Sequence, residues 1–323
     1  MRRKDFITRL ALLSAAGAIS IDPITAQIRQ LVPAKQIKNV GVQLFSLPFL
    51  LDKNFKAAIG MLADMGYSEI EMFGPYPFSM KSAKDSWKAV TPMLGFEGSG
   101  YFGLGEKEVI SIFKDYNMSV PAMHTDLDTL EHGMPQLAEA AHALGSTYVV
   151  LPSIPDERRK TLDDYKKMAD IFNAIGKSAK ALGVKFAYHN HGYGLTVVDG
   201  QKPLEIILDN TDPETVFLEM DLFWTVAGKA DPIAYLKKYK GRYKLMHVKD
   251  MKALKTFAGD GGDASQWIPL FGNMTSAGSG VLNLKEIIPT AIDCGMDHFF
   301  VEQDMVANPE EALKDSASYM LSL

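Results

Sequence analysis

The chain has 323 residues, of which 47% are hydrophobic and 23% charged, so it is long enough to bury a large core and is globular rather than disordered. Its net charge of −5, with no dense basic run beyond the first few residues, argues against a nucleic-acid partner, because phosphate binding needs clustered Lys and Arg. Cys294 is the single cysteine, which excludes an intrachain disulfide and a zinc site built on cysteines.

The first 27 residues have the pattern of an export signal. A basic start at Arg2 and Arg3 precedes an apolar, small-residue stretch at 10–21, which is too short for a spanning helix. We therefore expect a periplasmic protein without stable membrane insertion. Arg2 and Arg3 followed by Phe6 and Ile7 resemble a twin-arginine signal with one residue too many. An ordinary signal or an uncleaved surface anchor is the alternative.

From residue 38 to 323, short apolar runs alternate with amphipathic runs. Strands are expected at residues 39–45, 67–73, 120–123, 148–152, 184–188, 216–220, 244–248 and 298–301. Helices are expected at residues 54–65, 106–116, 129–144, 161–182, 203–208, 233–239, 284–292 and 309–321. Strict alternation predicts a parallel sheet with crossover helices, and eight repeats predict a (β/α)8 TIM barrel, an α/β fold of one domain. A doubly wound open sheet is the alternative, but the first strand lacks the glycine-rich turn that such a sheet needs.

Two long segments rich in glycine interrupt this alternation, at residues 74–105 and within 251–279. Neither combines a preceding strand with a following helix in the way that a phosphate-binding loop does. Both are too long for tight connections, so we interpret them as functional loops or lids.

Four of the expected strands end in side chains that bind metals, namely His189, Asp221, His247 and Glu302. The active site of such a barrel lies at the C-terminal ends of its strands, and neighbouring strands are only about 5 Å apart. The four side chains can therefore converge on one divalent ion, for which Zn²⁺, Mn²⁺ or Co²⁺ suits two imidazoles and two carboxylates. A rim residue with an ordinary hydrogen bond is the alternative for any one of them.

Two further histidines stand near these strand ends. His191 shares a strand face with His189 by the two-residue period, so it either contacts substrate or replaces His189 as the ligand. His124 ends the third strand and is a candidate substrate contact.

Three other side chains are candidates for contacts with a substrate. Lys249 shares a face with His247 and offers a positive charge to a substrate oxygen, unless it is a surface lysine. Trp224 follows the sixth strand and offers an apolar wall for a sugar face, with core packing as the alternative. Glu71 ends the second strand, where it is a candidate base or hydroxyl acceptor, or a member of a rim salt bridge.

At these residues the chain resembles the sugar phosphate isomerase/epimerase family of xylose-isomerase-like barrels, and its His-Asn-His form points to an exported bacterial branch. Relatives within that group include inositol-catabolism isomerases, ketose 3-epimerases and endonuclease IV. The motifs that carry the resemblance are Val42-Gln43-Leu44-Phe45-Ser46, Tyr188-His189-Asn190-His191-Gly192, Asp221-Leu222-Phe223-Trp224, His247-Val248-Lys249-Asp250, Gly278-Ser279-Gly280-Val281 and Val301-Glu302-Gln303-Asp304.

The resemblance implies a TIM barrel from residue 38 on, with the family's metal ligands falling on Asp221, His247 and Glu302. The ligand position on the fifth strand, usually a glutamate in ketose epimerases, falls on His189. In those epimerases the glutamates of strands five and eight are similar to a two-base pair, so the resemblance implies proton transfer by Glu302 and His189. This branch often carries a carboxylate soon after the His-Asn-His run, and this chain has none at 192–195.

We therefore expect a metal-dependent isomerase or epimerase that acts on a small carbohydrate, a sugar or keto-sugar, through an enediolate. Glu302, His189 or Glu71 would move the proton. One alternative is a lyase or hydratase of 3-keto-glycosides on the same metal site, and another is a non-catalytic sugar-binding barrel. Endonuclease activity is a distant further alternative. Export argues against phosphorylated substrates, and a homo-oligomer is left open.

Overall fold

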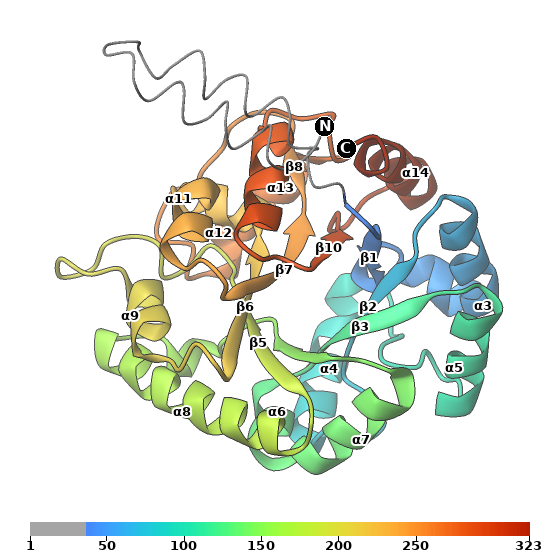
Figure 1. Cartoon of the computed structure of the whole chain (residues 1–323), viewed down its shortest axis with the longest axis horizontal. Helices are drawn as coiled ribbons and strands as arrows, with labels where there is room; N and C mark the ends of the chain where they lie inside the picture. The colour runs from blue at the N-terminus through green and yellow to red at the C-terminus, as the bar shows by residue number, and fades with distance from the viewer. Residues whose placement is uncertain (1–36) are drawn as a thin grey trace, which may run out of the picture. The chain divides into compact units, whose positions relative to one another are not determined.

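Eight parallel strands form a closed barrel in the computed structural model, which describes residues 37–323 (Figure 1). The expected signal at 1–27 lies outside the described residues. Around the barrel the strands follow chain order, and the last strand pairs with the first. The strands are β1 (Gly41–Gln43), β2 (Glu69–Phe73), β3 (Ser119–His124), β4 (Tyr148–Leu151), β5 (Lys185–His189), β6 (Val216–Asp221), β7 (Tyr243–Val248) and β10 (His298–Val301). The closed barrel confirms the predicted fold and excludes the open sheet.

The interior of the barrel combines large and small side chains. The rings of Tyr148 and Phe300 are buried together with the small residues Ala122 and Ala187. Phe300 also packs against Gly41, where a Cβ atom would lie 2.4 Å from the ring, so the first strand needs glycine at that position. This apolar layer supports the polar strand ends.

Helices surround the barrel and bury their apolar stripes against it (Figure 1). The longest, α8, begins with a capping box in which Thr161 and Asp164 bond each other's backbone. The main helices are α3 (Pro48–Asp64), α5 (Glu106–Asp115), α6 (Leu127–His132), α7 (Met134–Leu144), α8 (Leu162–Ala181), α9 (Pro203–Asn210), α10 (Leu222–Ala227), α11 (Pro232–Lys238), α13 (Leu284–Asp293) and α14 (Pro309–Met320).

The two glycine-rich segments contain more regular structure than the sequence predicted. Residues 74–105 include helix α4 (Lys81–Leu94), in which Thr91 is buried and Trp87 and Leu94 pack, partly buried, against the core. Trp87 holds this helix, because its ring packs on Phe73 and Phe96 and its indole N–H donates to the carbonyl of Glu97. Residues 251–279 include helix α12 (Ala264–Phe271) and a strand pair, β8 (Asp250–Met251) with β9 (Met274–Thr275).

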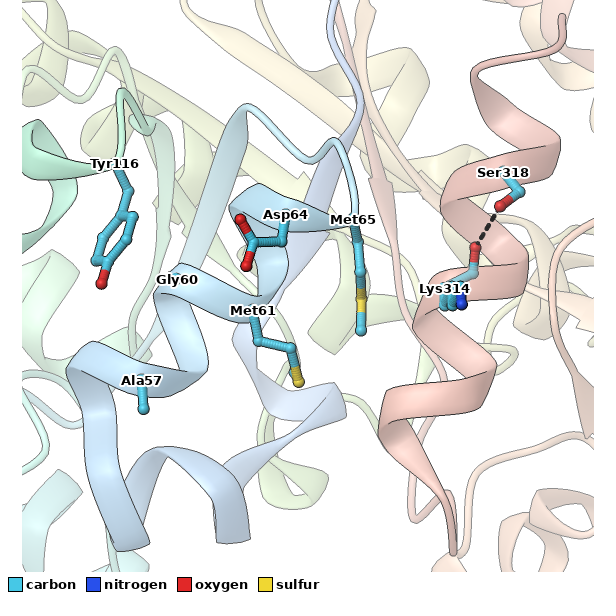
Figure 2. A pocket seen from close by; sticks show the side chains of 8 residues that line it. All are labelled: Ala57, Gly60, Met61, Asp64, Met65, Tyr116, Lys314 and Ser318. Carbon is cyan, nitrogen blue, oxygen red and sulfur yellow. Dashed lines mark hydrogen bonds between the residues drawn. The ribbon is translucent and has the colours of Figure 1, made fainter.

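No helix within residues 37–323 is long and apolar enough to cross a membrane. The outer layer of helices carries one pocket of about 660 Å³, between α3 and α14, lined by residues that include Met61, Met65, Tyr116 and Lys314 (Figure 2). None of the candidate site residues lines it, so the chemistry has to be sought at the strand ends.

Candidate functional site

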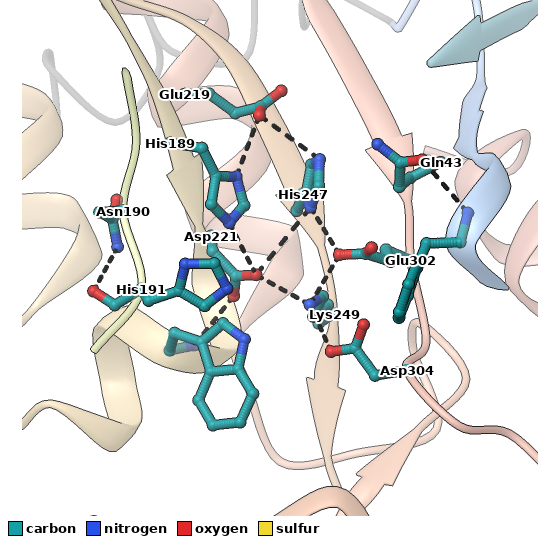
Figure 3. Close-up of polar contacts among 12 residues, drawn as sticks. Gln43, His189, Asn190, His191, Glu219, Asp221, His247, Lys249, Glu302 and Asp304 are labelled. Atoms are coloured by element: carbon teal, nitrogen blue, oxygen red, sulfur yellow. Dashed lines mark hydrogen bonds and ion pairs between the residues drawn. The ribbon is translucent and has the colours of Figure 1, made fainter. Parts of the chain in front are cut away.

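The C-terminal strand ends bring a group of buried charged side chains together (Figure 3). Asp221 and His247 are register partners on β6 and β7, and Glu302 directly follows β10. Because parallel strands end at the same edge, their last side chains meet there. All three are buried.

Asp221, His247 and Glu302 form what we call the rim set, whose ligand atoms lie within 4.8 Å of one another. His247 Nδ1 lies 2.6 Å from Glu302 Oε2 and 4.0 Å from Asp221 Oδ2. His189 Nε2 lies 3.6 Å from Asp221 Oδ2. The structure thus brings three of the four expected ligands into one set and places the fourth beside it.

His189 instead belongs to a second group, the inner set, with His124, Glu219 and His247. Glu219 Oε2 lies 2.8 Å from His124 Nε2 and 3.0 Å from His189 Nδ1. The sequence reasoning missed Glu219, which it treated as part of the strand. The signal was present, because Glu219 precedes Asp221 by two residues and therefore shares its strand face.

Lys249 is fully enclosed by carboxylates rather than exposed. Its ammonium lies 2.6 Å from Glu302 Oε2, 2.9 Å from Asp221 Oδ2 and 2.7 Å from Asp304 Oδ2. Burial alone would lower the pKa of Lys249, but these carboxylates raise it well above its ordinary value. Lys249 therefore carries a positive charge. The sequence reasoning did not assign Asp304 to the site.

Glu71 is a counter-charge for two imidazoles. Its Oε2 lies 2.5 Å from His247 Nε2 and 3.3 Å from His124 Nε2, and it accepts a hydrogen bond of 2.9 Å from Gln43. Burial opposes ionisation of Glu71, but His124 and His247 outweigh it and lower its pKa to about 2. For His124, burial is likewise outweighed, and Glu71 and Glu219 raise the pKa to about 9. His124 is therefore protonated near neutral pH.

His191 has the opposite protonation. Burial, followed by the charge of Lys249, lowers its pKa to about 3, and its Nδ1 is buried without a hydrogen-bond partner in the described part of the chain. Its ring stacks on Trp267 of α12, with centroids 5.1 Å apart and an angle of 5°. The insertion thus supplies an aromatic ring to the site. Trp224 is buried against Phe257 at 5.7 Å, which favours its role in packing.

Asp250 fixes the loop beyond Lys249 although it is not one of the candidate site residues. Its carboxylate accepts backbone hydrogen bonds of 3.0 Å from Gly278, Gly280 and Leu282. A Cβ atom on Gly280 would lie 2.2 Å from Asp250 Oδ1, so this approach requires glycine. The glycine at 280 in the 278–281 motif is therefore explained by the structure.

The residues at the strand ends fit a divalent cation. Imidazole nitrogen and carboxylate oxygen are ligands that Zn²⁺, Mn²⁺ and Co²⁺ accept. Glu71 Oε1 and Glu219 Oε1 are buried acceptors without a hydrogen-bond partner among residues 37–323. Asp221 Oδ2 lies near Lys249 Nζ but also lacks a bond of good geometry. Buried acceptors of this kind call for a cation or a donor.

Comparisons with known proteins agree with this fold. Inosose dehydratase 2 of Bacillus cereus is 34% identical over 161 residues, which are 48% of this chain and 53% of that relative. The match thus spans about half the length of the curated relative.

Two solved structures share the fold. A sugar phosphate isomerase/epimerase from Parabacteroides distasonis has a TM-score of 0.69 at 24% identity, covering 90% of this chain and 96% of that one. The IolI protein with a binding zinc atom has a TM-score of 0.61 at 17% identity, covering 88% and 98%. The sequence profile described as xylose isomerase-like TIM barrel matches residues 59–323. The chain therefore belongs to the xylose isomerase-like TIM barrel family.

Proposed function

We propose that the chain is a metal-dependent lyase that eliminates water, or another β-substituent, from a cyclic keto-polyol or keto-sugar. Elimination needs a group that takes the proton α to the carbonyl and a group that gives a proton to the departing oxygen. The observation that carries the proposal is geometric: an unpartnered imidazole nitrogen, His191 Nδ1, and an imidazole held between two carboxylates, His124, both lie next to His189, with ring centroids 5.0 Å and 5.3 Å from its ring. The match to an inosose dehydratase supports the same reaction class.

His191 would accept the proton from carbon. Its Nδ1 is buried without a partner, and stacking on Trp267 fixes the ring. The proton for the departing oxygen would come from the network of His124, Glu71 and Glu219, which holds an imidazolium between two carboxylates. The substrate thereby loses one hydrogen and one hydroxyl group as water, and a carbon–carbon double bond forms beside the carbonyl.

Asp221, His247 and Glu302 would hold the metal, with His189 beside them. A divalent ion held there would supply Lewis-acid polarisation of a substrate carbonyl. Lys249 would hold Glu302 and Asp221 in their ionised form, because its ammonium lies within 3 Å of both. The zinc atom of the IolI neighbour makes Zn²⁺ the first ion to test.

The isomerase or epimerase reaction stays a prediction. In that reaction Glu302 and His189 would act as two proton-transferring groups on one substrate carbon. Elimination instead expels a group from the neighbouring carbon. Both reactions exchange the same C–H with solvent, so exchange alone does not separate them.

The test incubates the purified full chain and Zn²⁺ in D₂O with an inosose and, separately, with a 3-keto-glucoside. NMR follows C–H exchange, and mass spectrometry follows loss of water or alcohol. We expect exchange together with loss of the β-substituent and formation of an enone. Exchange with retention of that substituent would instead favour the epimerase, and neither change would favour a non-catalytic binding barrel. His191→Asn should abolish elimination, whereas His132→Asn, at an exposed helix position, should not.

A further inference from the structure

The hydroxyl of Tyr76 is buried without a hydrogen-bond partner in the part of the chain that the structure describes. The residue is 1% exposed and stands three positions after β2, the strand that carries Glu71. A buried hydroxyl that makes no bond typically costs about 1–3 kcal/mol. Such a group needs a partner, and an atom of a bound ligand is one that would supply it.

Packing fixes the position of Tyr76 although its hydroxyl makes no hydrogen bond. Its ring stacks on Phe78, with centroids 5.1 Å apart and an angle of 2°, and meets the edge of Tyr101 at 5.9 Å. Its backbone N–H donates to Ser79 Oγ at 3.0 Å. The same loop is tied to the strand ends, because the N–H of Gly74 donates to the carbonyl of His124 at 3.0 Å. The ring of Tyr76 is therefore held in place on a loop that is bonded to the end of the third strand.

Glu71 of the site is one of the groups whose charge reaches this hydroxyl. Burial is the main cause that raises the pKa of Tyr76 well above its ordinary value, and the charges of Tyr101 and Glu71 add to it. Tyr76 thus remains a hydroxyl donor at neutral pH. Glu71 Oε1, also buried, has no partner either in the described residues. A donor and an acceptor are both left open at the same end of the barrel.

The other open polar atoms near the strand ends are mostly acceptors. They are Glu71 Oε1, Glu219 Oε1, Asp221 Oδ2, Asn190 Oδ1, Gln303 Oε1 and, in the role proposed above, His191 Nδ1. The hydroxyls of Tyr76 and Thr125 are the open groups there that carry a hydrogen to donate. Substrate hydroxyl groups can donate to these acceptors, whereas a substrate oxygen that accepts a hydrogen bond can receive it from one of the two hydroxyls.

We propose that Tyr76 is a substrate-contacting residue whose hydroxyl donates a hydrogen bond to an oxygen of the bound keto-polyol, while a neighbouring hydroxyl of that substrate donates to Glu71 Oε1. The expected effect of Tyr76 on turnover rests on the proposed function. The expected effects of Tyr76 on protein stability and on polyol binding do not.

The test compares Tyr76→Phe with Tyr101→Phe in the full chain. Tyr101 belongs to the same aromatic group, but its hydroxyl bonds Glu106 at 3.0 Å. We expect Tyr76→Phe to melt at or above the wild-type temperature, because it removes an unpaired buried hydroxyl. It should also bind myo-inositol or an inosose roughly tenfold more weakly, with a matching fall in kcat/KM. Tyr101→Phe should melt lower and bind as the wild type does.

Three results would be decisive. A Tyr76→Phe protein that melts clearly lower and binds the polyol normally would overturn the proposal, because Tyr76 would then be structural. A wild type that eliminates water while Tyr76→Phe does so with unchanged kcat/KM would overturn it and leave the proposed function intact. A wild type that binds the polyol without eliminating water, with binding weakened in Tyr76→Phe, would support Tyr76 and contradict the lyase.

Discussion

The ammonium of Lys249 lies 2.6 Å from Glu302 Oε2, a carboxylate oxygen of the rim set. The same ammonium lies 2.9 Å from Asp221 Oδ2. The protein's own cation therefore neutralises two of the carboxylates that would hold a divalent ion. An ammonium and a divalent ion that share these carboxylates would repel each other, so we expect Lys249 to set how tightly the site holds a metal.

Lys249→Met should separate two roles of Lys249, neutralising the buried carboxylates and weakening metal binding. Without metal, the buried carboxylates lose their counter-ion, which typically costs about 3–5 kcal/mol. Zn²⁺ should restore more stability than it does in the wild type, because it no longer competes with the ammonium. Thermal melting with and without Zn²⁺ measures both effects. The control is Lys244→Met on β7, the strand that Lys249 follows; Lys244 pairs with Asp297 and donates to the carbonyl of Gly295, away from the rim set. A smaller zinc-induced rise in melting temperature in Lys249→Met than in Lys244→Met would sink the idea.

Asp221 also caps a helix, so a variant that tests it as a metal ligand has to keep that cap. Its Oδ1 accepts a hydrogen bond of 2.9 Å from the Trp224 N–H and caps α10, so Asp221→Ala should cost about 1 kcal/mol of stability. Asp221→Asn keeps an oxygen for the cap but loses the charge. We expect it to fold normally and to bind Zn²⁺ at least roughly tenfold more weakly in calorimetry. Unchanged zinc affinity would remove Asp221 from the ligand set.

Arg159 connects the glycine-rich insertion to the start of α8. Its guanidinium donates to the carbonyls of Gly262 at 3.0 Å and Ile154 at 2.9 Å and lies 4.0 Å from the ring centre of Tyr193. Arg159→Met should free the insertion and loosen Trp267 from His191. Hydrogen exchange at 259–268 should quicken, and ligand affinity should fall roughly tenfold for a loss of about 1–2 kcal/mol.

Arg158→Met is the matched control for that prediction. Arg158 pairs with Glu131 at 3.0 Å and makes no hydrogen bond to the insertion in the described structure. Its loss should leave exchange at 259–268 and ligand affinity unchanged. Equal effects of the two variants would show that the insertion is not held through Arg159.

His124 should make stability depend on pH in a defined window. Its pKa in the folded protein is raised from 6.5 to about 9. Its contribution to the free energy of unfolding is therefore complete below pH 6.5 and is lost as the pH rises through 9. The shift corresponds to about 3 kcal/mol. Compared with His124→Asn, the wild type should hold its largest advantage at about pH 6 and lose it by about pH 10. Denaturant unfolding across this range checks the prediction, and a difference that stays constant with pH would contradict it.

The barrel and the ends of its strands could be predicted because they depend on local pattern. Apolar runs that end in polar residues mark buried strands, and Asp221, His247 and Glu302 followed such runs. Helix α4 escaped prediction because it lies in a segment rich in glycine and proline. Its inward positions, Ala83, Trp87, Thr91 and Leu94, form a short stripe in which Trp87 provides much of the packing.

The inner set was harder to foresee because it depends on how side chains pair across the barrel. Glu219 lies within an apolar strand, and only its partners on β3 and β5 show why a buried carboxylate is tolerated there. The stacking of His191 on Trp267 joins residues far apart in the chain through an insertion whose path the sequence does not define. The opposite protonation of His124 and His191 likewise follows from three-dimensional surroundings.

Removal and return of the metal test the central claim most directly. The full chain would be stripped with a chelator, and elimination of water from an inosose would be measured before and after titration with Zn²⁺, Mn²⁺ or Co²⁺. We expect the stripped protein to be inactive, and one equivalent of a divalent ion per chain to restore elimination in the wild type but not in His247→Ala. Full turnover by the stripped protein, or restoration in His247→Ala by one equivalent, would contradict a metal-dependent lyase at the rim set.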